Sequence, residues 1–328
     1  MRLNICIVSI FICLLLATSC TEKKVVFNQR EFISLSGKWH CDLGEINLPG
    51  TVDESRLAPR NSDTLSTGQL TRLNPYVGKM KYTKELEIPA GSAQKEWRLI
   101  MERTKPSTVW IDKDSIGTSS LILSPQIYNL GKLAAGKHTV TIVIDNSPAS
   151  VPQGIHGSHA WTDATQTNWN GIIGKFGLEA NDGILISDLQ VYPNVSSKTI
   201  PVVAQIKSSV SGKAEISVQG YLWNTAQNIA IPEQVININL KEGLETYKFD
   251  INVGNKHVLW SEFDPALYKV NFAIESQNIK DSYTIDFGIN RVLSTHAIIA
   301  HAVCLAVHCL LRRIGMTLYT HCLHVYGI

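Results

Sequence analysis

The sequence predicts an all-β protein made of two β-sandwiches, one after the other along the chain. Short segments in which apolar and polar residues alternate recur from Lys79 to Phe287, and a period of two is typical of strands with one wet face. Turn residues separate these segments, and no stretch in the first half shows a convincing helical period. The length of 328 residues leaves room for two ordinary domains.

The charge of the chain excludes one class of partner. The formal net charge is +2, and residues of both signs are scattered along the sequence. Such a distribution provides no basic field for nucleic acid and no acidic tail. We therefore expect no nucleic-acid partner.

The N-terminus predicts export. Arg2 precedes an apolar run over residues 5–16, followed by small residues and Cys20. The run is shorter than the ~20 apolar residues that span a bilayer. This order resembles a bacterial lipoprotein signal, which would make residues 1–20 the signal peptide and Cys20 the lipidated residue. An ordinary cleaved signal is the alternative, and both predict an exported protein.

A lipidated Cys20 would place the protein in the periplasm or on the outer membrane or cell surface, attached to the membrane through its lipid. Residues 21–33 are polar and charged, which predicts a tether. Of the seven cysteines, Cys41 alone lies in the body of the chain, between the signal and the last few dozen residues. The body therefore depends on its apolar core and not on disulfides.

Residues 34–192 are predicted to form the first sandwich, of jelly-roll type. Its first strand is expected around Trp39, and residues 54–78 have the irregular polar composition of a long surface loop bordering a site. Further strands are predicted at residues 79–88, 97–101, 109–111 and 139–145, with turns at 112–114, 130–131 and 135–137.

The polar stretch that ends this sandwich is the candidate site. Residues 146–170 are too polar and too broken for a core, and TQTNWNGIIGKFGLE then leads into an apolar strand, so we expect an exposed loop. A pyranose has one apolar face and a ring of hydroxyls, and binds an aromatic platform beside amides or carboxylates. The loop supplies this mixture in Trp161, Asp163, Gln166, Asn168, Trp169 and Asn170. The alternative is that Trp169 and Asn170 fix the loop against the sandwich or a further domain.

Residues 193–292 are predicted to form the second sandwich, of immunoglobulin-like type. The boundary is placed near Tyr192, because Pro193 and Pro201 flank a short polar stretch. Seven alternating segments give the number and spacing of an immunoglobulin-like fold: ILISDLQVY, VVAQIKSSV, AEISVQGYLW, VININL, TYKFDINV, LYKVNFAIE and SYTIDFGI.

Several motifs together resemble the non-catalytic front half of glycoside hydrolase family 2. They are VWI, the segment AGKHTVTIVIDN, the loop NWNGIIG, and LWSEFDPALYKV leading to DFGINR, and the most specific are Trp260, Pro265, Leu267, Tyr268 and Phe287-Gly288. The resemblance covers Ser34 to Arg291. It implies a galactose-binding-like jelly roll, an immunoglobulin-like domain, and then a (β/α)8 barrel that carries two catalytic glutamates.

The chain departs from this pattern at its end. Asn290 stands where the family usually has arginine, and the sequence after Val292 does not continue into a barrel. Residues 293–328 contain five of the ten histidines and three of the seven cysteines but no Asp or Glu. Their spacing matches no recognised zinc motif, so no metal or cofactor is expected and the tail is interpreted as a frameshift or truncation.

The resemblance therefore assigns no catalytic residue to this chain, because both glutamates of the family lie on the barrel. The loop acids nearest the candidate site are Asp53, Glu54, Asp163 and Asp182, which we interpret as solvated or capping residues. Residues His156 and His159 lack a nearby third ligand for a metal.

Two hypotheses for function remain. In the first, the chain is the N-terminal portion of an exported glycosidase, inactive without its barrel. In the second, it is a stand-alone carbohydrate-binding surface lipoprotein. A reading frame shifted after Val292 that restores a barrel would favour the first, and stop codons in every frame would exclude it.

Overall fold

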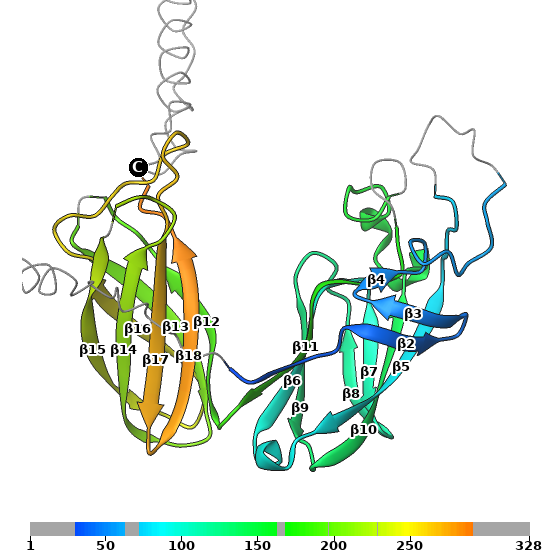
Figure 1. The fold of residues 1–328 in the computed structure, drawn as a ribbon, viewed down its shortest axis with the longest axis horizontal. Helices are drawn as coiled ribbons and strands as arrows, with labels where there is room; N and C mark the ends of the chain where they lie inside the picture. The colour runs from blue at the N-terminus through cyan, green and yellow to red at the C-terminus, as the bar shows by residue number, and fades with distance from the viewer. Residues whose placement is uncertain (1–29, 63–71, 163–167, 196, 228, 291–328) are drawn as a thin grey trace, which may run out of the picture.

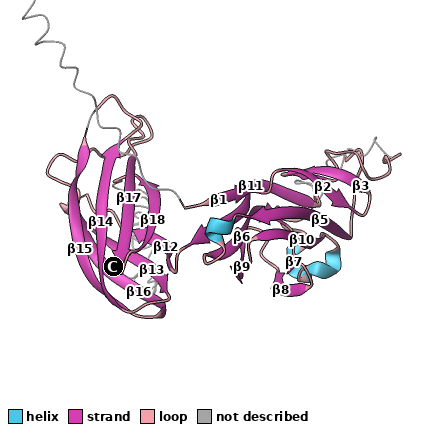
Figure 2. Cartoon of the chain, turned by 60° about the horizontal axis from the view of Figure 1, so that its bottom comes forward, coloured by secondary structure: helices cyan, strands magenta, loops and turns pink. Residues whose placement is uncertain are grey.

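The computed structural model describes residues 30–62, 72–162, 168–195, 197–227 and 229–290, which form two β-sandwiches (Figures 1 and 2). Helical residues in these ranges are confined to single 3-10 turns at Ala90–Ser92, Pro148–Ser150 and Gln153–Ile155. No helix within them has the length and apolar composition needed to cross a membrane. The predicted all-β fold is confirmed. The expected signal, Cys20 and the tail 293–328 lie outside the described residues.

The first sandwich packs two antiparallel sheets face to face (Figure 2). One sheet has the order β3-β2-β5-β10-β7-β8, and the other has the order β1-β11-β6-β9 with β4 paired to β11. The strands are β1 Phe32–Ser34, β2 Gly37–Cys41, β3 Gly44–Leu48, β4 Gly50–Thr51, β5 Lys79–Ile88, β6 Glu96–Thr104, β7 Ser107–Ile111, β8 Asp114–Ser119, β9 Gln126–Lys132, β10 Gly136–Asp145 and β11 Gly171–Asn181.

Apolar and polar residues alternate along β5 and β10, which lie side by side in one sheet, so the apolar side chains face the core between the two sheets. Met80 and Tyr82 of β5 pair with Ile144 and Ile142 of β10, and all four side chains are fully buried. Trp39 and Phe176 meet inside the same core, with ring centroids 5.3 Å apart. Burying each large apolar side chain contributes about 1.5–3 kcal/mol, so the core stabilises the sandwich without a disulfide.

One predicted turn is wrong. Residues Leu130 and Gly131 lie inside β9, where the register to β6 shifts between Trp97 and Arg98. Gly131 adopts a positive φ of 69° and Leu130 is buried. At this β-bulge one extra residue of β9 stands beside a glycine with positive φ. Turns also use glycines with positive φ, so the Leu130-Gly131 sequence was mistaken for a turn.

Glycines in the candidate stretch allow close approach of the backbone. A Cβ on Gly171 would lie 2.2 Å from the carbonyl oxygen of Gly50, and Gly171 has a φ of 147°. A Cβ on Gly177 would lie 2.3 Å from the Cζ atom of Phe32. These two positions let β4 and β1 pair with β11, so the glycines serve strand packing.

The second sandwich has one sheet in the order β12-β13-β16 and another in the order β15-β14-β17-β18. Its strands are β12 Ile184–Val191, β13 Thr199–Ser208, β14 Gly212–Leu222, β15 Ala230–Leu240, β16 Gly243–Asn252, β17 Tyr268–Ser276 and β18 Ile279–Phe287. Each of the seven segments predicted from the sequence contributes one of these strands.

Both predicted boundaries of the first sandwich need correction. The second sandwich begins before residue 193, because β12 pairs with β13 along Ile184–Val191. The predicted tether 21–33 also overlaps the fold, because Phe32 and Ile33 pair with Glu179 and Leu178 of β11. In both cases the local composition is polar or mixed, and pairing with a distant strand decides the structure.

The residues that carry the family resemblance pack together in the second sandwich. Tyr268 and Phe287 stack with ring centroids 5.9 Å apart, and the Tyr268 hydroxyl accepts a hydrogen bond from the Val258 amide at 2.7 Å. A Cβ on Gly288 would lie 2.9 Å from that of Trp260, whose amide donates to the Ile289 carbonyl at 2.8 Å. The motif therefore closes the end of the sandwich from which the chain leaves at Asn290.

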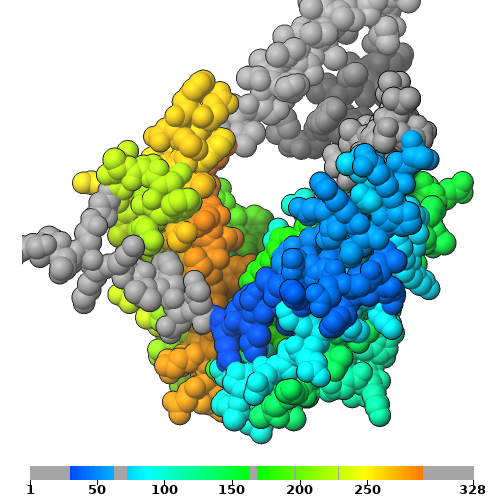
Figure 3. All heavy atoms as spheres, turned by 45° about the vertical axis from the view of Figure 1, so that its right-hand side comes forward, coloured from blue at the N-terminus to red at the C-terminus, as the bar shows by residue number. Residues whose placement is uncertain are grey.

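Arg30 joins the two sandwiches through buried charges. Its guanidinium donates two hydrogen bonds to Asp281 of β18, both at 2.7 Å, and one to Glu179 of β11 at 3.1 Å. It also donates to the Ile186 carbonyl of β12 at 2.7 Å. The three charged side chains are each at most 10% exposed. Figure 3 shows the blue N-terminal residues against the orange strands of the second sandwich.

The charges in this network stabilise one another. Burial by itself would raise the pKa of Glu179, but the positive charges of Arg98 and Arg30 outweigh burial and hold this pKa below its usual value. Burial likewise disfavours the charged form of Arg30, and Asp281 and Glu179 more than compensate, so the pKa of Arg30 is raised. Glu179 is therefore ionised. Removal of the Arg30 guanidinium leaves the buried Asp281 carboxylate without its ion-pair partner, while Glu179 keeps its pair with Arg98.

Replacement of Arg30 by methionine should destabilise the protein strongly. We expect Arg30→Met to lower the free energy of unfolding by about 3–5 kcal/mol, because it leaves the buried Asp281 carboxylate without its ion-pair partner. Denaturant titration followed by tryptophan fluorescence measures this change. Lys38→Met is the control, since Lys38 and Glu45 form an exposed pair and such pairs contribute under about 1 kcal/mol. Equal losses in the two variants would contradict the role given to Arg30.

Candidate functional site

Three connections meet at one end of the first sandwich, at the upper right of Figure 1. They are residues 50–62, residues 72–78 and the candidate loop, residues 146–170. Within the candidate loop, residues 163–167 are not among the described residues. The Val52 amide donates to the Asn170 carbonyl at 2.9 Å, and the Asn146 amide donates to the Gly78 carbonyl at 3.2 Å. The predicted long loop and the candidate loop are thus in direct contact.

Asn170 is a brace inside the sandwich. Its side chain is fully buried, and its Oδ1 accepts a hydrogen bond from the Tyr82 hydroxyl at 2.7 Å. Its Nδ2 donates to the carbonyls of Gly78 and Ile144 at 3.0 and 3.1 Å. Burial raises the pKa of the Tyr82 hydroxyl, which stays protonated and able to donate. Asn170 therefore uses its amide to hold β5 and β10 to the start of β11.

Asn168 continues this internal network through Asn146. The Asn146 side chain donates to the carbonyls of Tyr76 and Asn168, at 2.7 and 2.8 Å, and the Asn168 Nδ2 returns a bond to the Asn146 carbonyl at 2.9 Å. Both residues are buried. Sequence reasoning missed Asn146, although its place directly after the strand that ends at Asp145 could have indicated a strand-end brace.

The two tryptophans of the loop surround a lysine. Trp161 is 4% exposed and Trp169 is half-buried. The Nζ of Lys105 lies 4.9 Å from the centroid of the Trp161 ring and 5.3 Å from that of Trp169. Sequence reasoning missed Lys105, because it lies between β6 and β7, far from the loop along the chain.

The expectation of an exposed loop is wrong for Trp161, Asn168 and Asn170, all of which are buried. Polar composition predicted exposure, but the Asn170 amide and the Asn168 Nδ2 form hydrogen bonds inside the sandwich, which offset the cost of their burial. Asp163 and Gln166 lie outside the described residues. Among the described candidates, Trp169 is the one that keeps part of its surface accessible.

Of the acidic and histidine residues that the sequence suggested near the loop, Asp53 and His156 have partners there, whereas Asp182 lies at the junction of the two sandwiches. Asp53 accepts two hydrogen bonds from Arg72, at 2.6 and 2.9 Å, and Asp182 lies 3.7 Å from the Nζ of Lys95. His156 Nε2 lies 2.8 Å from the Pro148 carbonyl oxygen. No group of three or more His, Cys, Asp or Glu side chains within the described ranges is arranged to hold a metal ion.

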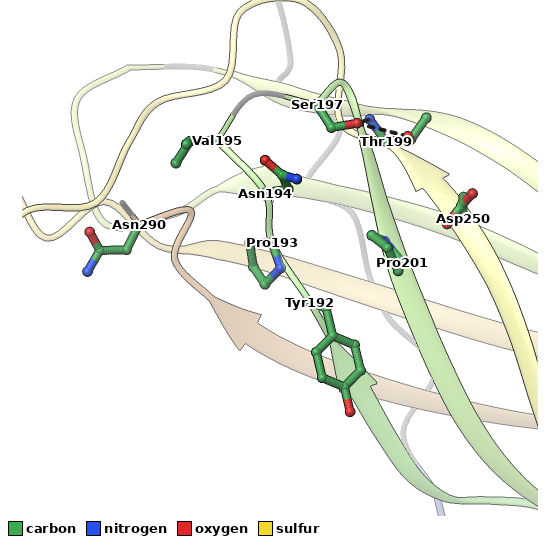
Figure 4. Close-up of a pocket in the computed structure, with 9 residues that line it drawn as sticks. All are labelled: Tyr192, Pro193, Asn194, Val195, Ser197, Thr199, Pro201, Asp250 and Asn290. Atoms are coloured by element: carbon green, nitrogen blue, oxygen red, sulfur yellow. Dashed lines mark hydrogen bonds between the residues drawn. The ribbon is translucent and has the colours of Figure 1, made fainter. Parts of the chain in front are cut away.

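Two hollows lie away from this loop. One, of about 470 Å³, is on the second sandwich beside Tyr192, Asn194, Thr199, Asp250 and Asn290. Figure 4 shows the side chains of Tyr192, Asp250 and Asn290 spread around its rim and pointing in different directions. The other, of about 450 Å³, lies at the junction, where Lys95 pairs with Glu31 and Lys280 with Glu275.

The two sandwiches together are similar in fold to parts of several solved glycosidases. A calcium-binding mutant of Bacteroides uniformis β-glucuronidase 2 matches with a TM-score of 0.58 and 17% identity, over 80% of this chain and 33% of that one. A putative β-galactosidase from Bacteroides fragilis gives 0.62 and 15%, over 80% and 41%. The β-D-mannosidase from Dictyoglomus thermophilum gives 0.60 and 16%, over 79% and 36%.

Residues 184–290 match the family model described as Glycosyl hydrolases family 2. The resemblance to this family, suggested by the sequence motifs, is thereby confirmed. The matched segment is the second sandwich with its exit at Asn290. No curated protein matches the chain. The chain spans about a third to two fifths of the length of the three solved enzymes named above.

Removal of the Asn170 side chain should destabilise the first sandwich. Asn170→Ala would leave the Tyr82 hydroxyl and the carbonyls of Gly78 and Ile144 without this partner, at a cost of about 2–4 kcal/mol, since each buried unpaired group costs roughly 1–3 kcal/mol. Denaturant titration measures the loss. Asn129→Ala is the control, because Asn129 is exposed on β9 and its loss should stay within about 0.5 kcal/mol. A similar cost at both positions would exclude the bracing role.

Proposed function

We propose that this chain is the non-catalytic N-terminal portion of an exported glycosidase of family 2 type, an enzyme that hydrolyses O-glycosyl bonds in carbohydrate metabolism. The match of residues 184–290 to the family carries this proposal. The order of the two sandwiches supports it, since three solved glycosidases contain a similar pair. In this proposal the sandwiches recognise carbohydrate and support a catalytic domain, and do not cleave the sugar themselves.

Two of the acids that the sequence suggested near the candidate loop, Asp53 and Asp182, support a non-catalytic role. Glycoside hydrolysis by retention needs two carboxyl groups ~5–5.5 Å apart, on either side of the scissile bond. Asp53 is held by Arg72, and Asp182 lies beside Lys95 at the junction. Each of the two therefore lies beside a cation of the fold, and they come from different parts of the first sandwich.

Within this proposal, Trp169 contacts the sugar. The accessible part of its indole offers an apolar surface to one face of a pyranose. Asn168 and Asn170 are bound within the sandwich and act on the sugar through the position of the loop. We also propose, from the sequence alone, that Asp163 and Gln166 contact carbohydrate, since both lie outside the described residues.

The purified chain without its predicted signal, residues 21–328, should bind carbohydrate and not hydrolyse it. We expect no turnover of aryl β-glucuronides, β-galactosides or β-mannosides, because the family resemblance places both catalytic glutamates on the barrel. Release of the chromogenic aryl group measures turnover. Turnover that survives further purification would overturn the non-catalytic assignment.

Sugar binding is measured on the same protein by calorimetric titration with the matching methyl β-glycosides. We expect Trp169→Ala to weaken binding roughly tenfold, the effect of losing ~1.4 kcal/mol of stacking. Trp223→Ala is the matched control, because Trp223 is an exposed tryptophan on the second sandwich and also lies beside a lysine, Lys269. Equal weakening by the two variants would exclude Trp169 as the contact. Tight binding by the chain alone would favour a stand-alone carbohydrate-binding lipoprotein over an enzyme portion.

We propose in addition that Cys20 carries a lipid that holds the exported protein at the membrane. The support is the order of basic, apolar and small residues before Cys20. Cys20→Ser should therefore abolish metabolic labelling with a radioactive fatty acid and move the protein from the membrane fraction to the soluble fraction. Lys23→Ser, in the predicted tether, is the control. Unchanged labelling in Cys20→Ser would refute the anchor.

A further inference from the structure

The connection between β6 and β7 holds both ends of the candidate loop. The Thr104 hydroxyl donates to the Gly171 carbonyl at 2.7 Å, just after the loop. The Pro106 carbonyl accepts a hydrogen bond from the Asp145 amide at 2.8 Å, just before it. Because one short turn contacts both ends, it sets the position at which the loop leaves and rejoins the sandwich.

Lys105 extends from this turn into the loop. It is only 4% exposed, and its Nζ donates to the Ala160 carbonyl at 3.2 Å while facing the rings of Trp161 and Trp169. A buried ammonium is costly unless hydrogen-bond acceptors and aromatic faces replace its hydration. Here the loop supplies an acceptor, the Ala160 carbonyl, and two aromatic rings. The buried ammonium of Lys105 and the conformation of the loop therefore stabilise each other.

The backbone of Lys105 is itself fixed from the other side. Gln126 is fully buried, and its Nε2 donates to the Lys105 carbonyl at 3.0 Å and to the Leu121 carbonyl at 2.6 Å. Its Oε1 accepts a hydrogen bond from the Ser107 hydroxyl at 2.5 Å. The lysine therefore projects from a rigid turn, and its ammonium has little freedom to follow a moving loop.

We propose that Lys105 is the positioning residue of the candidate loop. Its ammonium holds the buried Trp161 ring and the half-buried Trp169 ring in one arrangement, so that Trp169 presents its accessible surface to a pyranose before any sugar binds. Such preorganisation favours binding, because the loop loses little freedom when the ligand arrives. The sugar rests on the function proposed above, whereas the positioning of the loop does not.

Hydrogen exchange tests the positioning without a ligand. In Lys105→Met, which keeps an apolar stem of similar length, we expect exchange of the Trp161 and Val52 amides to rise about tenfold or more, because the cation–π contacts and the bond to Ala160 are lost. Lys105→Arg keeps the cation and should stay within about twofold of the wild type. Unchanged protection of both amides in Lys105→Met would overturn the proposal.

Lys84→Met is the matched control for this experiment. Lys84 also lies over a tryptophan, with its Nζ 5.8 Å from the centroid of the Trp39 ring, and donates to the Ser36 carbonyl at 2.9 Å. Its replacement should leave the Trp161 and Val52 amides protected as in the wild type. If Lys105→Met does not fold, Trp169→Leu takes its place, since removal of one ring should expose the same two amides. Full protection in Trp169→Leu would then count against the proposal.

Titration with the methyl β-glycosides separates this proposal from the proposed function. We expect Lys105→Met to weaken sugar binding about tenfold and Lys105→Arg to weaken it by less than about twofold. If the wild-type chain binds no sugar while amide protection still depends on Lys105, the sugar-binding function fails and the positioning role stands. Binding that Trp169→Ala abolishes and Lys105→Met leaves unchanged would overturn the role of Lys105 in presenting Trp169.

Discussion

The arrangement of the whole molecule depends on the guanidinium of Arg30. It lies where the N-terminal segment, β11 of the first sandwich and β18 of the second meet, and it is bonded to a carboxylate from each sandwich. Buried ion pairs contribute little net stability but tolerate few alternative geometries. The network therefore fixes the direction of one sandwich relative to the other. In Figure 1 the candidate loop and the end of β18, near the exit at Asn290, lie on the same side of the molecule.

A second set of polar contacts gives the candidate loop its shape. Asn146, Asn168 and Asn170 use their amides to hold the loop to β5 and β10, and Lys105 holds its two tryptophans from the adjacent turn. Most hydrogen bonds of the described loop residues are thus internal. Among the candidate residues that the structure describes, Trp169 keeps an accessible part for a ligand, and its indole suits the broad apolar face of a sugar better than a charged group.

Predictions from the sequence were correct for features that depend on neighbouring residues, and wrong for features that depend on residues far apart in the chain. Strands such as β5, β10 and the seven of the second sandwich were predicted correctly in the described residues, because alternation is a local property. The bulge at Gly131 was mistaken for a turn, and the boundary between the sandwiches was placed after β12, because both are defined by pairing with another strand. A loop between β10 and β11 was predicted correctly, yet its asparagines were expected in solvent, because local polarity does not reveal which carbonyls lie nearby.

The sequence by itself determined the all-β class, the two sandwiches and the resemblance to family 2, because alternation and short motifs are written in consecutive residues. Only the tertiary structure decided that Arg30 ties the sandwiches together, that Asn170 is a brace, and that Lys105 meets Trp161 and Trp169. Arg30 and Asp281 are 251 residues apart in the chain. Contacts of this range form when sheets pack and bury polar groups, which must then find partners wherever the fold places them.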